Sequence, residues 1–146
     1  MFSQTAEYAL RAVVCLADAA PAARTSQQIA ELTQAPRDYL SKILQALGRA
    51  DLVAAQRGKR GGFSLTRAAE EITLYDVLEA VDPIPRIRRC PLGLRAHRTQ
   101  LCPLHRRLDS AMESVERELR GATIAEMMRP DAGVRPLCEI VEAAHA

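Results

Sequence analysis

The hydrophobic pattern of the first fifty residues predicts three helices. Residues 4–19 carry apolar side chains three or four positions apart, and Pro21 follows them as a residue that cannot continue a helix. Thr25 and Gln28 have the spacing of a capping box, which predicts a second, short helix. The third helix covers residues 36–49, with a proline in its first position. The apolar residues expected on its buried face are Tyr39, Leu40, Ile43, Leu44 and Leu47.

A basic, glycine-rich turn between two short apolar segments follows the third helix. Residues 52–55 and 63–65 have the length and composition of short strands. Between them the sequence QRGKRGG holds three cations and three glycines, and the glycines permit the positive φ angles of a hairpin. Three helices followed by a basic hairpin are the pattern of a winged helix-turn-helix. The predicted fold class is therefore mostly α.

The rest of the chain predicts a loop and one long helix. A helix over residues 73–81, with Thr73 as its N-cap, ends before Pro83. After a loop, a long helix carries apolar residues spaced four, three and four apart, a coiled-coil-like seam that should form a dimer interface. Thr123 and Glu126 have the spacing of a capping box for a last short helix. The seam residues are Leu108, Met112, Val115 and Leu119.

Basic residues are concentrated in the first half of the chain, although the net charge is only +2. Residues 1–67 contain nine Lys or Arg and five acidic residues, whereas the remainder contains 11 basic and 13 acidic residues. This asymmetry favours a polyanionic partner for the first half, and we expect double-stranded DNA. Aromatic residues make up only 3% of the chain, with no Trp, which disfavours modules that stack nucleic-acid bases.

Candidate DNA contacts lie on the third helix, on the hairpin and at the start of the second helix. Serine and glutamine side chains can hydrogen-bond base edges, whereas Arg and Lys suit phosphates or guanine. A purely solvated polar face is the alternative, but the position of these groups between a capped helix and a basic hairpin favours DNA contact. The candidates are Thr25, Arg37, Asp38, Ser41, Lys42, Gln45, Arg57, Lys59 and Arg60.

The sequence argues against several other classes of protein. Its longest uncharged run has seven residues, and no basic stretch precedes the first helix, so we expect no membrane span and a cytoplasmic protein. A nucleophile elbow, a phosphate loop and a zinc-protease helix are all missing, so we do not expect an enzyme. A winged-helix adaptor that binds no DNA is the remaining alternative, because fold alone does not fix function.

Two of the four cysteines lie in an arginine-rich loop. Residues 83–108 contain no acidic residue and seven arginines. Thiolates favour iron–sulfur clusters or zinc, and neighbouring arginines should lower the pKa of the thiols; two unused surface thiols are the alternative. Cys15 and Cys138 lie among apolar residues and should only pack. The cysteines and histidines of the loop are Cys90, His97, Cys102 and His105.

Several segments carry a family resemblance. The third helix reads PRDYLSKIL, the hairpin reads RGKRGGFSL, and EYALR stands at residues 7–11. Together with Cys90 and Cys102, these segments resemble the IscR/NsrR family of bacterial winged-helix regulators over roughly residues 1–128. The resemblance implies a homodimer that binds palindromic promoter DNA and pairs its long helices. In many members an iron–sulfur cluster senses iron–sulfur status, nitric oxide or redox state.

The chain departs from the three-cysteine pattern of that family, because the middle cysteine falls on Ala96. Some members use a histidine ligand, or an acidic N-terminal residue of the partner subunit. Two outcomes stay open: a cluster, [2Fe–2S] rather than [4Fe–4S], or a regulator without one that responds to a small ligand or to thiol oxidation. The candidate ligands are Cys90, Cys102, His105, Glu7 and His97.

These inferences predict a chain of three parts. Residues 1–82 should form a winged-helix DNA-binding domain, residues 83–105 a sensor loop, and residues 106–146 a dimerisation helix with a C-terminal segment. The predicted function is that of a sequence-specific transcription regulator, and a repressor rather than an activator.

Overall fold

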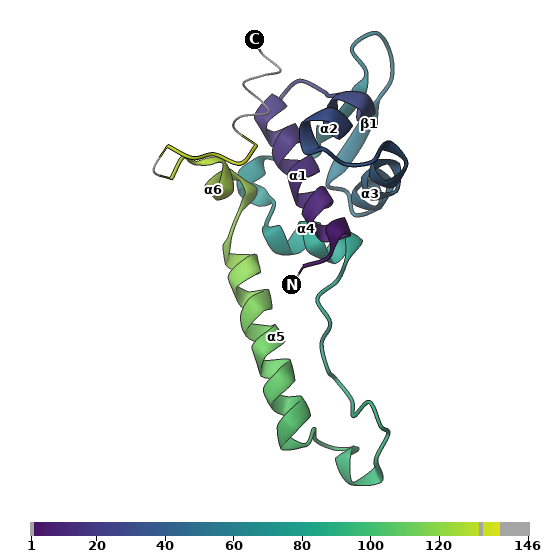
Figure 1. Cartoon of the computed structure of the whole chain (residues 1–146), viewed down its shortest axis with the longest axis vertical. Helices are drawn as coiled ribbons and strands as arrows, with labels where there is room; N and C mark the ends of the chain where they lie inside the picture. The colour runs from purple at the N-terminus through teal and green to yellow at the C-terminus, as the bar shows by residue number, and fades with distance from the viewer. Residues whose placement is uncertain (1, 132, 138–146) are drawn as a thin grey trace.

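Helix α1 (Gln4–Ala19) runs through a helical head, from which α5 (Pro103–Gly121) extends as a long arm (Figure 1). The structure is a computed structural model that describes residues 2–131 and 133–137. We call residues 2–82 and 122–128 the head, and residues 83–121 the arm. The other elements are α2 (Ser26–Thr33), α3 (Arg37–Arg49), β1 (Val53–Gln56), β2 (Gly62–Leu65), η1 (Ala69–Glu71), α4 (Leu74–Val81), η2 (Arg95–His97) and α6 (Ile124–Met128).

The first three helices pack around one apolar core, as the periodicity predicts. Leu16 of α1, Ile29 of α2 and Leu40 of α3 are fully buried in it. The expectation that Tyr39 is buried was wrong, because its side chain is 38% exposed. Its ring packs edge-on against Tyr8, with the ring centroids 6.0 Å apart, and its hydroxyl contacts the Thr5 hydroxyl. Tyr39 thus lies on the flank of α3 beside α1, where its hydroxyl keeps a polar partner.

Local capping signals set the beginnings of the helices. Thr25, Thr73 and Thr123 each cap a helix, and each forms a reciprocal capping box with the residue three positions later. Pro36 is the N-cap of α3, so this helix begins one residue later than predicted. Gln34 takes a left-handed conformation at the end of α2, which makes the turn between α2 and α3 tight.

The hairpin β1–β2 is tied to the loop before α2. Its strands pair antiparallel, with Val53 opposite Leu65 and Gln56 opposite Gly62. The backbone N–H groups of Arg24 and Phe63 each donate to the other residue's carbonyl, at 2.9 and 2.7 Å. Gly62 has a φ of 146°, and a Cβ there would collide with the Arg24 carbonyl. Glycine is therefore required at the point where the hairpin, which we call the wing, joins the head.

The chain returns to the head after the arm. Thr73 and Thr123 form an antiparallel bridge, and the Ile124 N–H donates to the Ile72 carbonyl at 2.8 Å. Ile72 and Ile124 are both fully buried. Both ends of the arm are therefore anchored in the same core, and α6 packs against α1.

The winged-helix prediction is confirmed: the described residues are mostly helical, with one two-stranded antiparallel sheet. None of the helices in the described part of the chain is long and apolar enough to cross a membrane.

Candidate functional site

Helix α3 presents a polar face to solvent. Its opposite face buries Leu40, Ile43, Leu44 and Leu47 in the core, which fixes the orientation of the helix. The Ser41 hydroxyl donates to the carbonyl of Arg37 at 3.1 Å, and a rotation of its side chain would free it for another acceptor. The exposed residues on this face are Arg37, Asp38, Ser41, Lys42 and Gln45, which are all DNA-contact candidates from the sequence.

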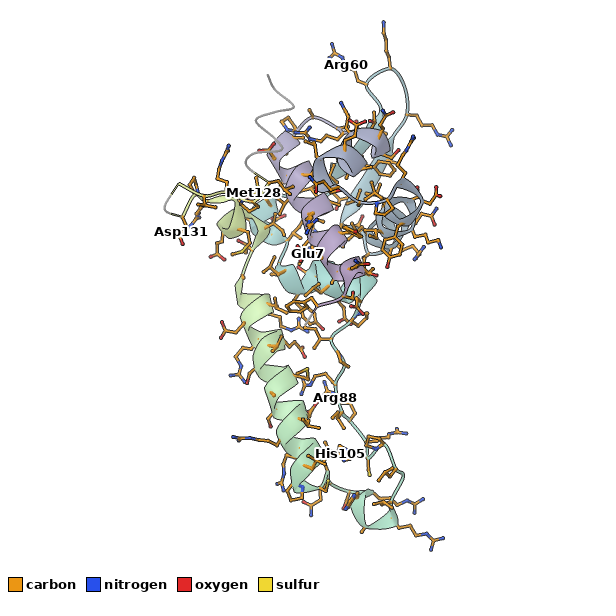
Figure 2. The ribbon with its side chains drawn as sticks, in the orientation of Figure 1. Glu7, Arg60, Arg88, His105, Met128 and Asp131 are labelled. Atoms are coloured by element: carbon orange, nitrogen blue, oxygen red, sulfur yellow. The ribbon has the colours of Figure 1, made fainter. Side chains whose placement is uncertain are left out.

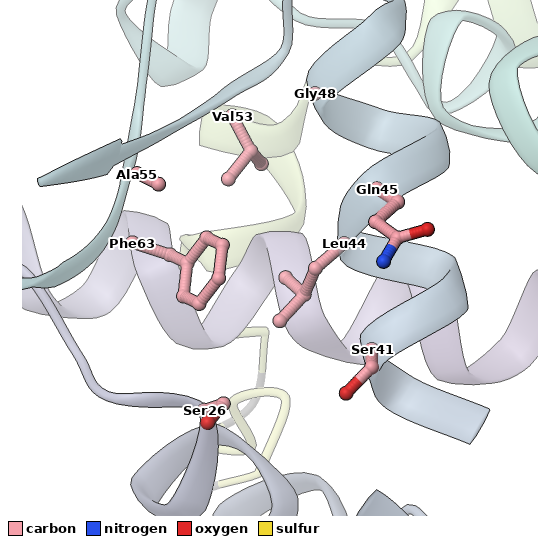
Figure 3. A pocket seen from close by; sticks show the side chains of 8 residues that line it. All are labelled: Ser26, Ser41, Leu44, Gln45, Gly48, Val53, Ala55 and Phe63. Atoms are coloured by element: carbon pink, nitrogen blue, oxygen red, sulfur yellow. The ribbon is translucent and has the colours of Figure 1, made fainter. Parts of the chain in front are cut away.

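A hollow of about 370 Å³ lies between α3, α2 and the wing (Figure 3). Leu44, Val53 and Phe63 contribute apolar side chains to it, and Ser41 and Gln45 line it from α3. It joins the exposed face of α3 to the wing.

The same hollow is also lined by Ser26, a residue that the sequence did not single out. The candidate beside it, Thr25, already uses its side-chain oxygen to accept the Gln28 N–H at 3.2 Å. Ser26 is the first residue of α2, where backbone N–H groups are free to meet an anion. The capping box at Thr25 predicts where α2 begins, so it could have pointed to Ser26 as the first residue of that helix.

The wing presents cations at one end of the molecule. Arg57, Lys59 and Arg60 are exposed, and they form no ion pair with any other residue that the structure describes. Figure 2 shows Arg60 at the tip of the wing, at the opposite end of the molecule from His105. Unneutralised cations on a narrow hairpin are suited to phosphate or minor-groove contact.

Each of the two histidines of the loop lies beside one of its two cysteines. Cys90 Sγ lies 3.4 Å from His97 Nδ1, and Cys102 Sγ lies 3.5 Å from His105 Nδ1. The hydrogen bond with His97 is the main cause that lowers the pKa of Cys90, followed by the backbone of Leu94. The prediction that arginines lower the pKa of this thiol was therefore wrong about the cause, because a direct hydrogen bond to the sulfur outweighs charges on side chains that solvent screens.

The other cysteines differ in their surroundings. Cys15 is 1% exposed, and burial raises its pKa to about 11, which confirms the expectation that it packs in the core. Cys138, also expected to pack, lies outside the described residues.

The arm is clamped by Arg86, which sequence analysis did not single out. Its guanidinium donates to both carboxylate oxygens of Asp109 at 2.8 and 2.9 Å, and to Glu116 at 2.9 Å. The Arg86 hydrogen bonds lower the pKa of Asp109 to about 2. Glu116 also accepts from Arg120, whose guanidinium lies 3.4 Å from the centre of the Tyr75 ring of α4. This series of contacts joins the segment 83–87, which precedes the cysteine loop (residues 88–105), to α5, and α5 to the head.

The predicted seam is only partly covered within one chain, because Met112, Val115 and Leu119 are half-buried. No residue of α5 is buried, and Leu108 is 48% exposed. Met112 and Val115 line a second hollow, of about 460 Å³, together with Phe2 and Ile84. Apolar side chains on two sides of an open hollow are suited to an apolar partner.

Comparison with known proteins identifies the family. A family model described as "Rrf2: Iron-dependent Transcriptional regulator" matches residues 2–130. The chain belongs to the Rrf2 family. A protein of Aquifex aeolicus, classed by its name among HTH-type transcriptional regulators, is 27% identical over 131 residues, which is 88% of this chain and 91% of that protein. Transcription regulation is thus the function of the family, and the resemblance inferred from the sequence is confirmed.

Solved structures share the Rrf2 fold. T. potens IscR superposes with a TM-score of 0.73 at 22% identity, over 87% of this chain and 85% of that one. CymR, the global cysteine regulator of B. subtilis, gives 0.71 at 22% identity, over 86% and 94%. The oxidised form of Staphylococcus aureus CymR gives 0.70 at 22% identity, over 90% and 98%.

Within the described part of this Rrf2 chain, the candidate ligands for an iron–sulfur cluster are not brought together. Cys, His and carboxylate donors are present, but the described residues contain no group of three or more of them that could hold a metal. Glu7 lies in the head, where it pairs with Arg11 at 3.0 Å, far from His105 (Figure 2). The described residues of one chain therefore offer two separate Cys–His pairs, whereas a cluster is held by three or four ligands.

Proposed function

We propose that this Rrf2 regulator is a homodimeric repressor that binds palindromic promoter DNA in the cytoplasm. The observation that carries this proposal is the continuous surface formed by the polar face of α3, the hollow beside it and the cationic wing. α3 would enter the major groove, Ser26 would meet the backbone, and Arg57, Lys59 and Arg60 would contact phosphates. A dimer seated on a promoter in this way represses transcription by occupying it.

Dimerisation would use the exposed seam of α5. Two copies of the hollow lined by Phe2, Ile84, Met112 and Val115 provide apolar surface that a second α5 can cover. A twofold axis between the two seams would relate the α3 helices of the two copies. Each α3 helix would then meet one half-site, and half-sites on one face of B-DNA lie about 34 Å apart.

Selection of bound duplexes from a random library tests the proposal. We expect enriched sequences with two inverted half-sites one helical turn apart, and affinity that falls steeply with salt. Enrichment of single, unpaired half-sites would contradict the dimer model, and no enrichment at any salt concentration would favour the adaptor. Transcription in vitro from a promoter carrying the selected site then distinguishes repression from activation.

For the signal, we propose thiol chemistry at Cys90 and Cys102. The two Cys–His pairs and the Arg86 clamp support this, because the clamp connects the loop to α5 and to the head. A [2Fe–2S] cluster would need a ligand besides the two Cys–His pairs, such as Glu7 of the partner subunit. The visible spectrum of anaerobically purified protein, with iron and sulfide assays, separates the thiol signal from the cluster. A colourless protein without iron supports the thiol signal. A coloured protein that contains iron and sulfide contradicts it.

A further inference from the structure

The cysteine loop contains a hollow of its own. It has a volume of about 370 Å³ and is lined by Arg89, Cys90, Gly93, Leu94, His97 and Arg98. Cys90, although only 9% exposed, forms part of its wall. Pockets for small molecules begin at about 300 Å³, so this hollow has room for a small ligand or for part of a larger one.

The charge around this hollow selects for an anion. Arg89 and Arg98 are both exposed, and neither forms an ion pair with a residue in the described ranges 2–131 and 133–137. The sequence from residue 83 to residue 108 contains no carboxylate that could neutralise them. Guanidinium groups bind carboxylates through paired hydrogen bonds, so the two arginines fit a ligand that carries carboxylates.

The chemistry at the wall of the hollow is that of a thiol beside a base. His97 Nδ1 lies 3.4 Å from Cys90 Sγ and can accept its proton. Cys102 has a similar distance to His105, 3.5 Å, but it is not among the residues that line this hollow. The hollow therefore distinguishes Cys90 from the other cysteine of the loop that has a histidine partner.

We propose that this hollow binds a small carboxylate-bearing disulfide, and that Cys90 exchanges with it to form a mixed disulfide. The Cys90 sulfur attacks one sulfur of the ligand, the S–S bond of the ligand breaks, and a new S–S bond to Cys90 forms. The other half of the ligand leaves as a thiol, with the proton that Cys90 passed to His97. Cys90 is oxidised and the leaving half is reduced. This inference rests on the proposed function in one respect, namely that the loop thiols carry the signal.

The test compares two disulfides of different charge. Wild-type protein is incubated with glutathione disulfide, which carries carboxylates, or with neutral 2-hydroxyethyl disulfide, and peptide mass spectrometry follows modification of Cys90. Because charge steering raises association rates by at least about tenfold, we expect Cys90 to favour glutathione disulfide by about that factor. In Arg89→Gln/Arg98→Gln the preference should disappear.

A matched control separates this hollow from the general charge of the loop. Arg88→Gln/Arg95→Gln also removes two exposed arginines of the loop, but neither residue lines the hollow, so the preference should persist. Equal loss in both double variants, no preference in wild type, or faster modification of Cys102 than of Cys90 would overturn the proposal. Circular dichroism confirms that each variant is folded.

A separate measurement keeps this inference distinct from the proposed function. The affinity for the selected DNA duplex is measured before and after Cys90 is fully modified. Unchanged affinity would contradict signalling by the loop and leave the disulfide site standing. A wild-type protein without preference for glutathione disulfide, or a preference that persists in Arg89→Gln/Arg98→Gln, would overturn the disulfide site and leave DNA binding by α3 and the wing standing.

Discussion

The head and the arm of this Rrf2 regulator are stabilised in different ways. The head surrounds a core in which Leu16, Ile29, Leu40 and Leu47 are fully buried. In the arm, α5 has no buried residue, and polar contacts of Arg86 and Arg120 hold it in place. The apolar core can fold a head within one chain, whereas the apolar seam of the arm is only partly covered. In the proposed dimer, a second copy of the chain would therefore complete the arm and not the head.

Removing one core side chain should have the largest effect, and only in the head. Leu40→Ala leaves a cavity and should lower the free energy of unfolding by about 2–5 kcal/mol. Leu104→Ala, at a leucine of α5 that is 64% exposed, is the matched control and should cost less than about 0.5 kcal/mol. Urea denaturation measures both. Similar losses in the two variants would show that the arm is packed as tightly as the head.

A charge in the seam should break the dimer without unfolding the head. Val115→Asp places a carboxylate among apolar groups and should weaken dimerisation by about 100-fold or more. Ser114→Asp, at the exposed neighbouring position, should sediment like wild type. Analytical ultracentrifugation gives the masses. A Val115→Asp dimer of wild-type strength would remove the seam from the interface.

Charge removal on the wing should affect only DNA binding. Arg60→Ala should lower affinity and reduce the slope of log K against log salt by about two, one for each wing of a dimer. Arg117→Ala removes an exposed arginine of α5 and should leave the slope unchanged. Fluorescence anisotropy titrations at several salt concentrations measure this slope for each variant. An equal change in both variants would mean that the arm also contacts DNA.

The smallest expected effect is on the clamp, and it depends on pH. The pKa of Asp109 in the folded chain, about 2, lies below its ordinary value of about 3.9, so the clamp stabilises the protein above pH 4 and loses this contribution as the pH falls to about 2. In Arg86→Gln the pKa of Asp109 should return toward its ordinary value, whereas Arg89→Gln should leave it low. Carboxyl NMR titration follows Asp109 directly. An unchanged pKa in Arg86→Gln would assign the shift to another group.

Features built from neighbouring residues could be predicted from the sequence. The spacing of α1, the capping boxes after Thr25 and Thr123, and the glycines of the wing were all predictable, because a helix turn or hairpin brings together residues only a few positions apart. The winged-helix fold followed from the order of these elements.

Contacts between distant segments could not be predicted in the same way. Arg86 meets Asp109 across 23 positions, and Thr73 meets Thr123 across the whole arm. Tyr39 has the spacing of a core residue, yet α1 offers its hydroxyl a partner at the surface. Such pairs depend on the path by which the chain returns to the head. Local periodicity carries no record of that path, because it orients each helix but does not choose the segment that packs against it.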